Sequence, residues 1–78
     1  MERLYAERVV ALFFRDQVKR QTTFDAIPEG PDKEVVRGFQ QGMEVGDEQA
    51  FAIFEKEFPG IVDDVRDRWE ALIQEEEG

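Results

Sequence analysis

The sequence predicts an all-α fold, a compact bundle of four short helices in a single domain. Three observations support this prediction: helix-forming residues dominate, the alternation of half-buried strands is missing, and Gly and Pro fall in clusters that cut the chain into four pieces. The 78 residues leave room for one modest core, which seven Phe and one Trp can help to fill. We expect helices at about residues 2–21, 31–45, 48–57 and 61–75.

The first expected helix has two apolar arcs on a helical wheel. One arc comprises Tyr5, Ala6, Val9, Leu12 and Phe13, and the other comprises Leu4, Val10, Ala11, Phe14 and Val18. We expect the first arc, with Val9, Leu12 and Phe13, to face the core. The second arc, with Val10 and Phe14, is then left for association with a copy of the chain or with a target. The remaining arc is polar and carries Arg8, Arg15 and Lys19.

The segment between the first two helices mixes turn formers with apolar residues. Phe24 and Ile27 are expected to fold back over the core as a buried strap. Pro31 follows Gly30 and is typical of a first helical position, with acidic residues in the first turn.

The second expected helix carries one apolar stripe that we expect to be buried. Its members are Val35, Val36, Phe39 and Met43. Gly38 and Gly42 each cost roughly 1 kcal/mol relative to Ala inside a helix, so either another backbone approaches closely or the helix breaks near Gly42. Both alternatives stay open.

The two remaining helices are bounded by Gly and Pro. Gly46 and Asp47 are expected to end the second helix and to cap the third. The third carries Phe51, Phe54 and Phe58 on one face, and Pro59 with Gly60 stops it. The fourth has a regular amphipathic stripe at positions 61, 62, 65, 69, 72 and 73.

The composition argues against catalysis. The chain has no Cys, His, Ser or Asn, which removes the usual nucleophiles, the imidazole base and the commonest zinc ligands. We therefore expect no enzyme activity, no catalytic residue, no resident metal and no cofactor. One alternative is a Mg-dependent nucleotide hydrolase, because Asp63, Asp67 and Glu70 share a face of the expected last helix. The other interpretation of these carboxylates is a solvated face with ion pairs such as Asp64 with Arg68.

The charge is uneven along the chain. The net charge is −9, with a balance of +2 over residues 1–21 and −11 over residues 22–78. Such an acidic surface repels nucleic acid and anionic lipid and attracts basic protein surfaces. The apolar run at residues 9–14 is too short to span a membrane, so a cytoplasmic protein is expected. The acidity can also reflect a salt-adapted source, an alternative that needs no partner.

These features predict a small non-catalytic protein-interaction module that acts as an inhibitor, a regulator or an accessory subunit. Its partner is a protein with a basic or apolar surface, without direct contact to nucleic acid or membrane. The expected partner-binding residues are Val10, Phe14, Val18, Arg15, Asp63, Asp67 and Glu70. The alternative is a structural homo-oligomer, such as a homodimer, that is built around the first helix.

Overall fold

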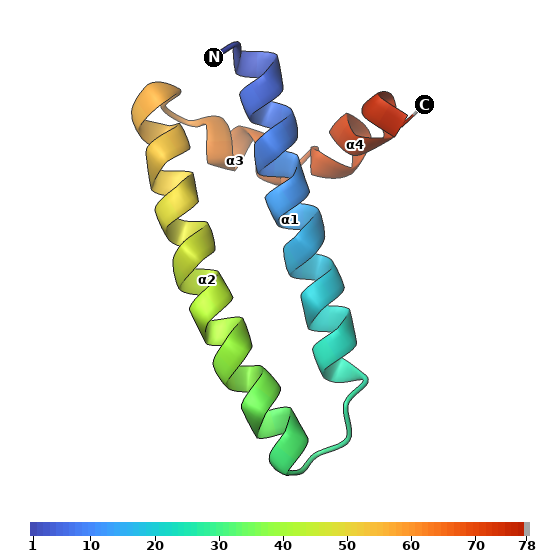
Figure 1. Cartoon of the computed structure of the whole chain (residues 1–78). Coiled ribbons are helices and arrows are strands. Elements are labelled where there is room, and N and C mark those ends of the chain that lie inside the picture. The colour runs from blue at the N-terminus through green and yellow to red at the C-terminus, as the bar shows by residue number, and fades with distance from the viewer. Residues whose placement is uncertain (78) are drawn as a thin grey trace.

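The computed structural model describes the backbone of residues 1–77 and the side chains of residues 1–75. These residues form four helices and no strand: α1 (Arg3–Asp25), α2 (Pro31–Glu57), α3 (Ile61–Arg66) and α4 (Trp69–Glu77). The prediction of an all-α fold is confirmed. Figure 1 shows α1 and α2 as a long antiparallel hairpin, with α3 between their ends and α4 on the other side of α1.

The first helix is longer than expected, and the predicted strap is wrong. Residues 22–25 continue α1, so Phe24 belongs to the last helical turn. Its ring lies under two cations of α2, with Lys33 Nζ at 4.7 Å and the Arg37 guanidinium at 5.4 Å from the ring centroid. This cation–π contact joins the two helices next to their connecting turn, away from the core.

The predicted break at Gly46 and Asp47 is also wrong, because α2 is one helix of 27 residues. It begins with Pro31 in its first turn, as expected, and runs through Gly38 and Gly42. Asp47 does not cap a helix. Its buried carboxylate accepts hydrogen bonds from Gln17 and Arg20 of α1, and these cross-helix bonds favour a continuous helix.

Three of the four residues of the apolar stripe expected to be buried on the second helix are exposed, and Val36 is half-buried. The exposed fraction is 61% for Val35, 67% for Phe39 and 49% for Met43. The prediction failed because α1 packs on a different side of α2, where it meets Gln40 and Asp47. Nothing in the described chain approaches the Cβ positions of the α2 glycines within 4 Å. The close backbone contact considered for Gly38 and Gly42 is therefore absent within the described part of the chain.

The helix expected at residues 61–75 is divided into two helices. Pro59 and Gly60 end α2 as predicted, and Gly60 adopts φ +87°, a left-handed conformation that favours glycine. The helix axis then turns at Asp67 and Arg68, where the Arg68 N–H donates to the Val65 carbonyl at 3.0 Å. The turn directs α4 across α1. The predicted apolar stripe still faces inward at Ile61, Val62, Val65, Leu72 and Ile73, while Trp69 is half-buried.

The core lies where α3 and α4 cross the first half of α1. Its buried residues are Ala6, Val10, Ala11, Phe14, Ile61, Val62, Val65, Leu72 and Ile73. Leu12, Phe51, Phe54, Phe58 and Trp69 pack against them with part of their surface exposed. Each fully buried aliphatic side chain contributes about 1.5–3 kcal/mol, so this crossing is the main source of stability.

The prediction that the arc of Val10 and Phe14 lies outside the core is wrong, and of the other arc of α1 only Ala6 is fully buried. Val10 is fully buried and Phe14 is only 9% exposed, because α3 and α4 pack on their arc. Val9 and Leu12 lie on the other arc and are only partly buried. A wheel shows that two arcs exist, but it cannot show which arc two other helices will cover.

None of the helices in residues 1–77 combines the length and apolar character needed to cross a lipid bilayer.

Candidate protein-interaction site

The junction of α3 and α4 forms an acidic elbow, which we define as residues 63–75. It carries five carboxylates and two guanidinium groups. A shallow surface concavity at the elbow is lined by Arg66, Asp67, Arg68, Trp69, Glu70, Ala71 and Gln74. Trp69 is half-buried, since one part of it packs against the core. An aromatic ring therefore lies among exposed carboxylates in a hollow of the surface.

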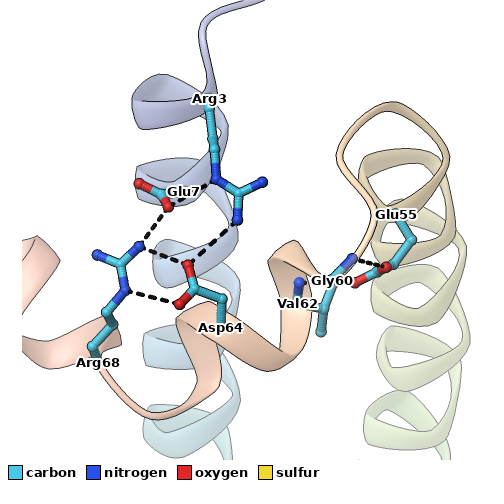
Figure 2. A network of polar contacts seen from close by, with 7 residues as sticks. All are labelled: Arg3, Glu7, Glu55, Gly60, Val62, Asp64 and Arg68. Carbon is cyan, nitrogen blue, oxygen red and sulfur yellow. Dashed lines mark hydrogen bonds and ion pairs between the residues drawn. The ribbon is translucent and has the colours of Figure 1, made fainter.

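Arg68 fixes the elbow to the rest of the fold, as Figure 2 shows. Its guanidinium donates to Glu7 of α1 and to Asp64 of α3, the latter at 2.8 Å. Arg3 completes the ring, with its side-chain nitrogens 3.4 Å from Glu7 and 3.5 Å from Asp64. Glu7 is buried and is held between both guanidinium groups, which offsets the cost of removing its charge from water.

A second carboxylate fixes the start of α3. Glu55, in the last turn of α2, accepts hydrogen bonds from the Gly60 and Val62 N–H groups at 2.8 Å each (Figure 2). These N–H groups have no partner within α3, so Glu55 acts as a cap supplied by the preceding helix. The two bonds lower the pKa of Glu55 below its ordinary value.

The ring of ion pairs also favours the charged forms of its members. The hydrogen bond from Arg68 lowers the pKa of Asp64, and the bond to Asp64 raises the pKa of Arg68. Asp64, Arg68 and Glu55 are therefore charged at neutral pH and hold α3 against α1 and α2. The exposed groups of the elbow are carried on this braced frame.

The predicted acidic residues of the last helix all lie at the elbow. Asp63 is exposed on α3 and pairs with Arg66 at 3.6 Å, while Asp67 and Glu70 line the concavity. The bend between α3 and α4 removes the single helix face on which the hydrolase alternative depended. Among the described side chains, no group of three acidic residues could hold a metal ion.

The predicted apolar residues of the first helix do not form a common surface with the elbow. Val10 and Phe14 lie in the core, so neither side chain is available to a partner in this conformation. Val18 is half-exposed on the same side of α1, beyond the core. Arg15 is half-buried, with Nε 3.5 Å from the Asp16 carboxylate.

Sequence reasoning missed the residues that brace the elbow. The pairing of Asp64 with Arg68 was visible from their four-residue spacing, and the structure confirms it. Glu7 and Glu55 had no such signal, because their partners lie 61 and up to seven residues away in the chain. Their roles depend on the crossing of α1 by the elbow.

The chain matches no family model, no curated protein and no solved structure.

Proposed function

We propose that this chain is a non-catalytic protein-interaction module that binds a partner with a basic surface at the acidic elbow. The observation that carries the proposal is the concavity beside Trp69, which Asp67 and Glu70 line and which the Arg68 network holds in place. In this role the chain serves as a cytoplasmic inhibitor, regulator or accessory subunit.

The chemistry of the elbow suits a Lys or Arg side chain of the partner. A cation is attracted to the face of an indole ring, and Trp is the best such ring. Carboxylates beside the ring add charge-assisted hydrogen bonds to the same cation. Residues 47–78 carry eleven acidic and three basic side chains, so this end of the chain also attracts basic surfaces over a longer range.

The bracing contacts of the elbow support the same proposal. A site held in one conformation loses less entropy when a partner binds. Arg68 forms ion pairs with Glu7 and Asp64. Asp67 and Glu70 lie beside it and are exposed to solvent. Arg66, which also lines the concavity, pairs with Asp63. Among the described residues, neither Asp67 nor Glu70 forms an ion pair, so these two carboxylates are available to a cation of the partner.

A fluorescence titration tests the proposal, because Trp69 is the single Trp of the chain. We expect an oligolysine peptide to change the Trp69 emission in a saturable way that weakens as salt is added. Two exposed carboxylates contribute about 1–2 kcal/mol together, so the double variant Asp67→Asn/Glu70→Gln should bind about tenfold more weakly.

The control carries the same change of net charge at the far end of the hairpin. Asp25→Asn/Glu29→Gln should bind the peptide like the wild type, because both residues lie in or next to the turn between α1 and α2. If both double variants weaken binding equally, the effect is one of net charge and the elbow is not the site. If the Trp69 emission shows no saturable change, the proposal is wrong, and the acidic residues are better explained by a role in solubility alone.

A further inference from the structure

The hairpin has one face covered by α3 and α4 and an opposite face that the described chain leaves open. Lys19 and Thr23 follow Val10 and Phe14 by nine residues each, which at about 100° per residue places them on the opposite side of α1. Lys19 and Thr23 line a shallow groove together with Val36, Phe39 and Met43 of α2. The exposed apolar side of α2 therefore faces away from the core and from the elbow.

This open face of α2 has a regular seam. Its positions are Val35, Phe39, Gly42, Gly46, Gln49 and Ile53, spaced alternately four and three residues apart. That spacing is the one with which helices pack along their length. No charged side chain occupies the seam, and Val35, Phe39 and Ile53 are each more than half exposed. A helix seam of this kind is a packing surface, and no helix of the described chain packs on it.

The seam is nearly symmetric about its own centre at residue 44. In an antiparallel pairing about that centre, Val35 meets Ile53 and Gly42 meets Gly46 of a second copy, while Phe39 meets the polar Gln49. Large residues then lie at the two ends and small ones in the middle, where the backbones can approach closely. A two-fold interface requires this self-complementarity, and a foreign partner does not.

The charges fit the same arrangement. The pairing brings both Lys56 and Glu57 near the first turn of α2 in the second copy, where Asp32 and Glu34 lie, so the local contacts are attractive for Lys56 and repulsive for Glu57. Residues 1–46 have a balance of −1, whereas residues 47–78 have −8. An antiparallel pair separates the two acidic ends by about 40 Å, the length of α2, which is far beyond the screening distance of about 8–10 Å.

The available area is sufficient for a dimer. A strip about 10 Å wide along the 27 residues of α2, with the second half of α1 beside it, offers about 600 Å². Two copies then bury about 1,200 Å², which reaches the range of specific stable interfaces.

We propose that the open face of α2 packs against the same face of a second copy, antiparallel about a two-fold axis near Glu44, to form a homodimer. This surface differs from the alternative built around the first helix, because α1 contributes only its edge. The two elbows lie on the outer sides of the dimer, so this pairing is independent of the function proposed for the elbow.

Light scattering after size-exclusion chromatography tests the pairing. We expect the wild type at twice the chain mass of 9.1 kDa and Phe39→Glu at the chain mass. Gln41→Glu introduces the same charge on the same helix, on the side away from the seam, and should remain dimeric. Circular dichroism should show equal helicity for all three, because Phe39 and Gln41 are both exposed. A monomeric wild type, or a dimer that survives Phe39→Glu, overturns the proposal.

Disulfide cross-linking tests the orientation, since the chain has no Cys of its own. When Gly42→Cys and Gly46→Cys chains are mixed and oxidised, we expect the mixed disulfide to dominate. Parallel pairing would join each variant to itself instead, and that result would overturn the antiparallel arrangement. Gln41→Cys is the control and should not cross-link.

Discussion

At the scale of single residues, burial decides how much a side chain contributes to stability, and two valines show the contrast. Val10 is fully buried in the core, whereas Val45 of α2 is 55% exposed. We expect Val10→Ala to lower the free energy of unfolding by about 2 kcal/mol, from the two lost carbons and the cavity they leave. Val45→Ala should change the free energy of unfolding by no more than about 0.5 kcal/mol, because the exposed Val45 loses little buried surface and Ala is the better helix former. Urea denaturation of both variants checks this, and equal losses would contradict the assigned core.

At the scale of helices, two glycines are expected to respond in opposite directions to the same substitution. Gly38 lies inside α2 with nothing within 4 Å of an added Cβ, whereas Gly60 has φ +87°. Gly38→Ala should stabilise the chain by roughly 0.5–1 kcal/mol, because Ala restricts the unfolded chain and costs nothing in the helix. Gly60→Ala should destabilise it by about 1–2 kcal/mol, since the left-handed backbone is unfavourable for Ala. Thermal unfolding of the two variants gives the signs, and a destabilising Gly38→Ala would point to a break in α2.

At the scale of the whole molecule, the contacts that hold α3 predict a dependence of stability on pH. Asp64 and Glu55 have a lower pKa in the folded chain than in the unfolded chain. At pH values between the two, the unfolded state therefore binds more protons than the folded state. Their contribution is present above the ordinary pKa values of 4.5 for Glu55 and 3.8 for Asp64, and it is lost as pH falls through the lower folded values.

We therefore expect Glu55→Gln and Asp64→Asn to be less stable than the wild type at pH 7, with a difference that narrows as pH falls below about 4. Urea denaturation at a series of pH values measures this. Glu48→Gln, an exposed change on α2, is the matched control and should follow the wild type throughout. A difference that stays constant down to pH 3 would show that the carboxylate charges are not involved.

The sequence by itself determined the helical class, the start of α2 at Pro31, its end at Pro59 and Gly60, and the inward stripe from Ile61 to Ile73. These follow from local rules, because proline, glycine and apolar spacing act within a few residues. Of the candidate site, the sequence supplied Asp63, Asp67 and Glu70, but not the residues that brace them.

Only the tertiary structure decided which face of each helix is buried. The full burial of Val10 but not of Val9, the exposure of Phe39 and the continuity of α2 through Asp47 all depend on where another helix crosses. A helical wheel shows how apolar residues are distributed around one axis, but burial requires contact with residues distant in the chain. The buried contact of Glu7 with Arg68 across 61 residues exists only once the elbow crosses α1.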